Sequence, residues 1–314
     1  MKIRIGTRRS PLALWQAHHV SALLKANDAT LEVELMEIVT KGDKILDAPL
    51  AMVGGKGLFV KEIEEQLLSR EIDLAVHSLK DMPSVLPEGL VLGAIPLRED
   101  PRDALVSRRF RSLDELPKGA RVGTSSLRRA CQLKTARRDL EIVSIRGNVQ
   151  TRLRKIDEEL DAGVLAAAGL KRLELQERIT QLLTPRQCLP AVGQGALALE
   201  VRSDDAAILK RVSALEHAET RLAVSCERAF LRGLGGGCQV PIAAHATLDG
   251  AMLDFRGLVG HPDGSRVVEF SERVKVTTLA EAELLGAKGA GFVLARGAAK
   301  ILAEVLAPSG LPES

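Results

Sequence analysis

The sequence is poor in aromatic side chains, with no tyrosine, one tryptophan and six phenylalanines among its 314 residues. Proteins that bind single-stranded nucleic acid usually stack the bases on aromatic rings, so this scarcity counts against such a role. Charge argues in the same direction, because 44 lysines and arginines against 41 acidic residues leave a net charge of only +3. A dedicated nucleic-acid binder usually has a large basic excess. We therefore expect no nucleic-acid partner.

Long apolar runs and paired cysteines are missing as well. No stretch of about 18 apolar residues could cross a bilayer, and the first ten residues lack the apolar core of a signal peptide. The four cysteines form no Cys-x-x-Cys pair, which favours reduced thiols over disulfides or a zinc site. His77 has no second histidine or cysteine at metal-binding spacing and is expected to be a packed strand residue. We expect a cytoplasmic protein with no membrane contact and no metal.

Glycine, by contrast, is abundant, and one glycine tract surrounds a cysteine. Residues 233–241 read Gly-Leu-Gly-Gly-Gly-Cys-Gln-Val-Pro, between a helix-like run and a strand-like run. Glycines let a ligand approach the backbone closely, and Cys238 would be accessible on such a loop. On position alone, a glycine cap at the end of a helix explains the loop better than a reactive thiol does.

Residues 1–95 alternate strand and helix patterns. The expected strands span residues 1–10, 31–39 and 72–77. A helix capped by Ser10 and a second helix at 58–70 alternate with them. The apolar stripe of the first helix is expected to comprise Leu12, Trp15, His19, Ala22 and Leu23. This order predicts a parallel or mixed sheet covered by helices.

The connection at residues 40–57 is polar and rich in glycine. It is not a Walker phosphate loop, because Lys56 is followed by glycine and not by serine or threonine. A connection this long without its own periodicity is more often functional than a simple turn. We expect it to be a lid.

The strand–helix alternation restarts after residues 98–102 and breaks again at 185–191. The expected strands of this part are 121–123, 141–145 and 163–166, with helices from Ser126, from Asn148 and after the third strand. Beyond Arg202 the pattern changes. It comprises a helix (214–231), three strand-like runs (242–248, 252–259 and 266–275) and a glycine-interrupted helix (279–306). Asp-Gly turns between the strands predict an α+β module with an antiparallel sheet.

Arginines gather where strands are expected to pass into helices. Residues 7–10, 123–129 and 144–152 each place arginine beside a polar residue at a helix entrance, and residues 170–172 are a weaker fourth case. Helix starts favour anions, so arginine there is unfavourable unless an anion binds. Ligands of open α/β sheets bind at the carboxyl ends of strands, where these arginines would lie. The alternative is that each arginine pairs with a nearby acid on a solvated face, which explains one such case better than four. The pattern predicts a cleft for a polyanionic ligand.

One carboxylate is expected at the same edge. Asp81 follows the strand at 72–77 and precedes a proline-restricted turn. Arginines around it should keep it ionised, which suits it to stabilising a cation or transferring a proton beside an anionic substrate. The simpler alternative is that Lys80 and Asp81 only cap a loop.

Several segments, in order, resemble the porphobilinogen deaminase (hydroxymethylbilane synthase) family. They are Arg4–Gln16, Gly54–Phe59, His77–Pro83, Arg98–Ala104, Gly123–Arg129, Arg146–Arg152, Leu189–Gly195 and Gly236–Pro241. The resemblance implies an α/β fold with two periplasmic-binding-protein-like lobes containing mixed sheets. It also implies a C-terminal α+β domain with a three-stranded antiparallel sheet. The implied domains are 1–97 with 191–212, 98–190, and 213–314, the last carrying the cofactor cysteine.

The resemblance also implies an activity and a site. Four porphobilinogen molecules would be joined head to tail, with loss of ammonia, into the linear tetrapyrrole of heme biosynthesis. Cys238 matches the cysteine that holds a dipyrromethane cofactor through a thioether, and Asp81 matches the catalytic aspartate. Cofactor-binding positions are matched by Ser10, Lys80, Thr124, Ser126, Arg128, Arg129 and Arg146. Substrate-binding positions are matched by Arg8, Arg146, Arg152 and Arg172, and the family's mobile loop by Lys56 and Phe59.

The implied protein is a cytoplasmic monomer with a functional link to uroporphyrinogen-III synthase. Two other functions stay open from the residues themselves. A non-enzymatic anion-binding protein of the periplasmic type would use the same two lobes, but it leaves Cys238 unexplained. A nucleic-acid binder would use the arginines, against the charge balance described above.

Overall fold

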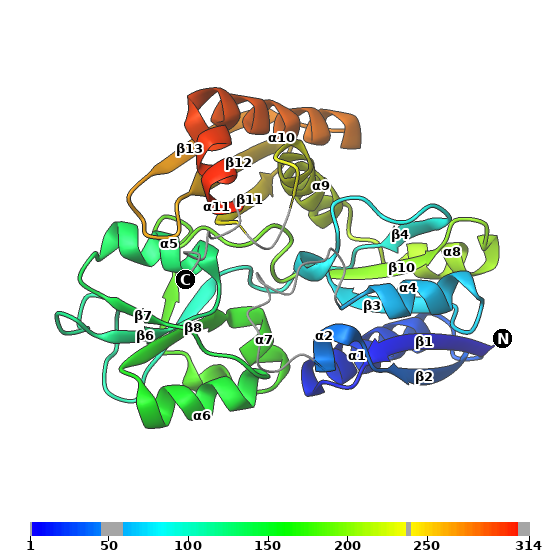
Figure 1. The fold of residues 1–314 in the computed structure, drawn as a ribbon. Coiled ribbons are helices and arrows are strands. Elements are labelled where there is room, and N and C mark those ends of the chain that lie inside the picture. Colours follow the sequence, from blue (N-terminus) through cyan, green and yellow to red (C-terminus); the bar gives the residue numbers. More distant parts are fainter. Residues whose placement is uncertain (1, 45–58, 237–239, 307–314) are drawn as a thin grey trace, which may run out of the picture.

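Three sheets organise the chain in the computed structural model, which describes residues 2–44, 59–236 and 240–306 (Figure 1). The first sheet contains, in spatial order, β2 (Glu32–Ile38), β1 (Lys2–Arg8), β3 (Leu74–Ser78), β10 (Leu197–Arg202) and β4 (Leu90–Ala94). Strands β1, β2 and β3 are parallel, whereas β10 is antiparallel to both of its neighbours. The first lobe therefore has the mixed sheet that was expected.

The second sheet repeats this plan. Its order is β7 (Glu141–Val143), β6 (Arg121–Gly123), β8 (Ala162–Ala166), β5 (Asp103–Val106) and β9 (Gln181–Leu183). Here β5 is the strand antiparallel to both neighbours. Residues 95–102 lead from β4 of the first sheet to β5 of the second, and residues 184–196 lead back from β9 to β10. Two lobes joined by two crossing segments confirm the expected α/β architecture.

Helix starts follow local capping chemistry, as the sequence predicted. Ser10, Ser126 and Asn148 each accept a backbone N–H at the starts of α1 (Pro11–Asn27), α5 (Leu127–Ala136) and α6 (Val149–Glu159). Among the described residues, the other α-helices of the two lobes are α2 (Lys41–Lys44), α4 (Lys61–Leu68), α7 (Ala167–Arg172) and α8 (Ala206–Val212).

The buried face of α1 differs from the predicted stripe. Its buried residues are Ala13, Gln16, Ala17, Val20, Ser21 and Leu24. Gln16 is buried because its side-chain amide donates to the Ser78 hydroxyl at 2.9 Å, a partner 62 residues away. Trp15 instead lies beside Arg172 of the second lobe. The prediction followed helical spacing and missed a face made of small and hydrogen-bonded side chains.

The C-terminal domain packs two helices and a helical extension against an antiparallel sheet (Figure 1). Its elements are α9 (Ala218–Gly233), β11 (Ile242–Asp249), β12 (Met252–Gly260), β13 (Val267–Lys275), α10 (Leu279–Val293) and α11 (Ala299–Leu306). Phe230, Phe255 and Phe270 form the aromatic centre of its core. Gly297, at φ 107°, interrupts the last helix as the glycines predicted. Helix α9 starts later than expected, because residues 213–215 form a separate 3-10 turn and His217 caps α9.

Candidate active site

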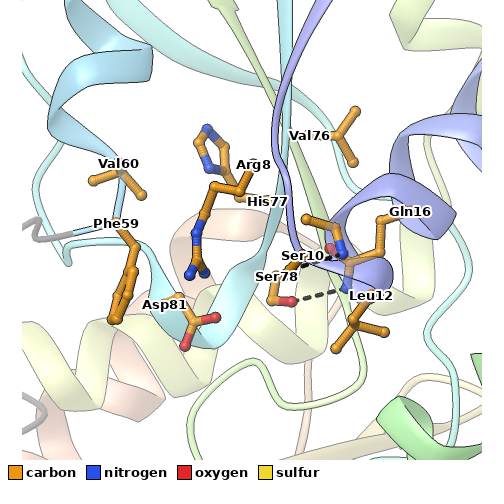
Figure 2. A pocket seen from close by; sticks show the side chains of 11 residues that line it. Arg8, Ser10, Leu12, Gln16, Phe59, Val60, Val76, His77, Ser78 and Asp81 are labelled. Carbon is orange, nitrogen blue, oxygen red and sulfur yellow. Dashed lines mark hydrogen bonds between the residues drawn. The ribbon is translucent and has the colours of Figure 1, made fainter. Parts of the chain in front are cut away.

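A cavity of about 70 Å³ lies at the carboxyl ends of β1 and β3 (Figure 2). Its lining includes Arg8, Ser10, Phe59, His77 and Asp81. Asp81 ends the 3-10 turn Leu79–Asp81, which directly follows β3, and its side chain is exposed. The carboxyl-terminal end of the first sheet thus has a solvent-exposed carboxylate, Asp81, in the same cavity as Arg8.

Arg8 is held by an aromatic ring and an acid. Its guanidinium carbon lies 4.2 Å from the centroid of the Phe59 ring, and its Nε donates to Asp43 Oδ1 at 3.1 Å. Burial raises the pKa of Asp43, but hydrogen bonds from Arg8 and Thr40 outweigh burial and lower it. The Arg8 cation is therefore oriented, and part of its charge is already balanced.

Lys80, next to Asp81, is electrostatically coupled to charged residues of the second lobe. Burial lowers the pKa of Lys80 to about 8, an effect that Asp81 opposes and the Arg129 cation reinforces. Electrostatic coupling of this kind requires that the turn after β3 approach the start of α5. Residues from both lobes therefore converge around Asp81.

Arg152, in the first turns of α6, adds to the positive charge. Burial lowers its pKa, Arg129 and Arg146 lower it further, and Asp81 raises it. Its Nε donates to the Gly147 carbonyl at 2.9 Å, and it forms no ion pair with any other described residue. The second lobe consequently presents excess positive charge toward Asp81.

Arg128 and Arg129 are turned inward and share one buried acid. Asp103 on β5 accepts from Arg128 Nη1 at 2.7 Å and from Arg129 Nη2 at 2.7 Å, and all three residues are buried. Burial alone would raise the pKa of Asp103, but the two guanidinium groups hold it far below its usual range. Asp103 cancels one of the two positive charges.

Arg8, Arg128 and Arg129 do pair with acids, although not with the nearby, solvated acids of the alternative considered from the sequence. Their acids, Asp43 and Asp103, lie 35 and 25 or 26 residues away in the chain. The pairs are also buried or partly buried, not on a solvated face. No local pattern around the arginines could have indicated them.

Three hydroxyl groups at helix entrances accept backbone N–H groups. Ser10 Oγ accepts from Ala13 at 3.3 Å, and Ser126 Oγ accepts from Arg129 at 3.4 Å. Thr124 Oγ1 accepts from Ser126 at 3.2 Å. A hydroxyl that accepts in this way still has its own O–H to donate.

Arg172 lies outside the cavity that contains Asp81, at a contact between the two lobes. It is buried, its guanidinium carbon lies 5.8 Å from the Trp15 ring centroid, and its Nη2 donates to the Gly195 carbonyl at 2.6 Å. Burial lowers its pKa to about 10, against a smaller opposing effect of Glu99. It does not line the cavity that contains Asp81.

Two predicted residues, Lys56 and Cys238, fall outside the described residues. The chain can be followed to the end of α9 and on to Gly236, which is at φ 45° and donates its N–H to the Leu231 carbonyl at 3.0 Å. Gly235 is also left-handed, at φ 78°. The glycine cap that the sequence suggested is present at this helix end.

Sequence reasoning missed several residues that organise the site. Asp43 and Asp103 orient the arginines, and Gln16 ties α1 to the end of β3. Asp103 and Gln16 had a signal, since they lie within Arg98–Ala104 and Arg4–Gln16, two of the segments that carry the family resemblance, whereas Asp43 lies in none of them. In the described ranges no three His, Cys, Asp or Glu side chains are grouped to hold a metal, and no helix is long and apolar enough to cross a membrane.

Comparison with known proteins bears on this geometry. A profile described as "Porphobilinogen deaminase, dipyromethane cofactor binding domain" matches residues 3–210, and one for the C-terminal domain of the same enzyme matches residues 221–293. A protein of Syntrophotalea carbinolica named "Porphobilinogen deaminase" is 58% identical over 302 residues, covering 96% of this chain and 95% of its own. The chain belongs to the porphobilinogen deaminase family.

This family assignment gives the reaction. The protein is a transferase that condenses four porphobilinogen molecules head to tail, with release of ammonia, into hydroxymethylbilane, using a dipyrromethane cofactor. The two other functions left open by the sequence are thereby set aside.

Solved structures that are similar to this chain at low sequence identity include nutrient-binding and methionine-binding proteins. A methionine-bound nutrient-binding protein of Burkholderia cenocepacia is 16% identical, with a TM-score of 0.45 over 70% of this chain and 93% of its own. A putative methionine-binding lipoprotein of Bacillus subtilis is 15% identical, with a TM-score of 0.40 over 69% of this chain and 90% of its own.

Proposed function

We propose that Asp81 is the catalytic carboxylate of this porphobilinogen deaminase. The observation that supports this is its exposed position within a group of cations from both lobes, namely Arg8 and Lys80 from the first and Arg129 and Arg152 from the second. Loss of ammonia from porphobilinogen leaves an electron-poor cation. A fixed carboxylate stabilises such a cation electrostatically and can accept the proton released when the next pyrrole carbon attacks.

The surrounding cations would bind the acid groups of pyrroles. Each pyrrole unit has an acetate and a propionate, and guanidinium groups bind carboxylates with two hydrogen bonds. Arg152 and Arg146 would take these groups directly. Arg8, whose charge is partly balanced by Asp43, would add a fixed donor fork beside Phe59. Arg172 would act at the contact between the lobes, where it meets Trp15.

The described residues fit a dipyrromethane cofactor. Such a group brings four carboxylates, and the second lobe has a positive excess because Asp103 cancels only one charge of Arg128 and Arg129. Lys80, Arg129, Arg146 and Arg152 would hold the acid groups, and Ser10, Thr124 and Ser126 have O–H groups to donate. Cys238 would be the attachment point, through a thioether. When bound, the cofactor supplies the primer to which the growing chain stays attached.

Further expectations concern the whole protein. The domains would comprise residues 1–97 with 191–212, residues 98–190, and residues 213–314. The loop around Lys56 and Phe59 would act as a lid over the site. We also propose a cytoplasmic monomer with a functional link to uroporphyrinogen-III synthase, which would receive the product.

Replacement of Asp81 by asparagine tests the central role. Asp81→Asn keeps the shape and removes the charge, so turnover should fall by about 10²- to 10³-fold while cofactor mass and fold are retained. Product formation would be followed by absorbance after oxidation of the tetrapyrrole, and the cofactor by intact mass. Glu88→Gln is a matched control, because Glu88 is exposed and precedes β4 at the opposite end of the sheet. Near-normal turnover of Asp81→Asn would remove Asp81 from the mechanism.

A further inference from the structure

A buried arginine of the C-terminal domain holds the loop that follows Asp81. Arg228 on α9 is 9% exposed, and its Nη2 donates to the carbonyls of Pro83 at 2.8 Å and Ser84 at 3.4 Å. None of the ion pairs among the described residues includes Arg228. Its guanidinium thus donates hydrogen bonds to uncharged backbone carbonyls two and three residues beyond Asp81.

Burial of the Arg228 cation lowers the free energy of unfolding of the protein. A cation without a carboxylate partner loses hydration that backbone carbonyls replace only in part. Burial lowers the pKa of Arg228 to about 10, and the nearby Arg232 and Arg221 lower it further, against an opposing effect of Glu200. A neutral side chain of similar size would avoid this cost. Unlike such a neutral apolar side chain, Arg228 donates hydrogen bonds to the Pro83 and Ser84 carbonyls of the loop.

The same face of α9 also packs against the turn that contains Asp81. Val224, four residues before Arg228, belongs to an apolar cluster with Leu79 and Met82, the residues on either side of Lys80 and Asp81. Residues four apart lie on one face of a helix. Leu79 is also held through its backbone, since its N–H donates to the Ala196 carbonyl at 3.0 Å. Helix α9 therefore contacts both the turn that ends at Asp81 and the loop that follows it.

The loop after Asp81 also meets the glycine segment at the end of α9. A Cβ atom added to Gly236 would lie 2.9 Å from Ser84 Oγ, so the backbone at Gly236 lies directly against the Ser84 side chain. One helix of the C-terminal domain thus contacts Pro83 and Ser84 through Arg228, and continues into a segment that touches Ser84 again.

We propose that Arg228 is a positioning residue, which fixes the Asp81 carboxylate relative to the C-terminal domain. This inference rests on the proposed role of Asp81. A misplacement of about 1 Å at a reacting centre can lower a rate by about 100-fold, so a loop anchor of this kind affects turnover without touching substrate. Because Arg228 lies outside the cation group around Asp81, its loss should leave substrate affinity largely unchanged.

Three variants test the proposal in the full-length, cofactor-bearing protein. Arg228→Met keeps most of the apolar volume and removes the donors, so kcat should fall by roughly 10- to 100-fold while KM stays within about two-fold. Arg228→Lys keeps one cationic donor and should recover part of kcat. Arg232→Met is the matched control, because Arg232 lies one turn further along α9, is exposed, and should leave kcat unchanged. Intact mass and thermal unfolding, measured on each variant, report cofactor content and folded fraction.

The outcomes separate the inference from the site on which it depends. Wild-type kcat in folded Arg228→Met, together with an inactive Asp81→Asn, would overturn the positioning role and leave Asp81 in place. Normal turnover of Asp81→Asn would overturn both. If Arg228→Met does not fold, Arg228→Lys decides: an intermediate kcat at unchanged KM supports the proposal, and a wild-type kcat contradicts it.

Discussion

Arg128 Nη1 lies 2.7 Å from Asp103 Oδ2, and both side chains are buried where β5 meets the start of α5. The same carboxylate accepts from Arg129 at 2.7 Å and from the Gln194 amide at 2.9 Å. Gln194 belongs to the segment that returns to the first lobe. Asp103 thus connects the arginines of the second lobe with the crossing between lobes.

Asp103→Asn should destabilise the protein strongly. The substitution keeps the shape but leaves two buried guanidinium groups without their counter-charge, which is expected to lower the free energy of unfolding by about 3–5 kcal/mol. Urea unfolding followed by circular dichroism measures this. Asp249→Asn is the control, since Asp249 pairs with Arg273 on the surface and should change stability by less than about 1 kcal/mol. Equal, small effects of the two substitutions would show that the Asp103 network does not stabilise the fold.

Glu64 on α4 should make stability depend on pH. Its side chain is buried near Glu200, whose Oε2 lies 3.0 Å from His77 Nε2. Burial, followed by the charges of Glu200 and Glu65, raises the pKa of Glu64 to about 7, while His77 opposes the shift. The folded protein therefore binds more protons than the unfolded chain between about pH 4.5 and pH 7. Stability is lost as pH rises through this window, because the carboxylate must ionise while buried.

Glu64→Gln removes this titration. The variant should gain stability over the wild type as pH rises, by roughly 2–3 kcal/mol above pH 7 and little below pH 4.5. Denaturant unfolding at pH 4.5, 6, 7 and 8 measures the difference. Glu65→Gln, at an exposed neighbour on the same helix whose charge raises the pKa of Glu64 less than burial and Glu200 do, should show a much smaller trend. A stability difference that is constant with pH would refute the assigned titration.

Local chemistry is the part of the structure that the sequence could predict. Ser126 and Asn148 cap their helices because a side-chain oxygen reaches an N–H only three residues on. The position of Asp81 at the end of β3 likewise follows from the short-range strand pattern. The resemblance to the family then supplied the reaction and the expected roles of individual residues.

Contacts between distant segments could not be predicted in this way. The burial of Gln16 depends on Ser78, and the inward turn of Arg128 and Arg129 depends on Asp103. The contacts of Arg172 with Trp15 and the Gly195 carbonyl join segments from the two lobes. Each of these arrangements depends on a partner that no periodicity or motif indicates.

The intact mass of the purified protein tests the proposed site most directly, because we propose that Cys238 is the tether of the cofactor. Protein made in a host that produces porphobilinogen should weigh more than its sequence by two linked pyrrole units, and Cys238→Ala should have the mass of its sequence alone. Each of the other three cysteines is buried in the structure, so Cys131→Ala serves as a control that should keep the added mass. A wild-type mass equal to the bare sequence, or an added mass that survives Cys238→Ala, would contradict the account.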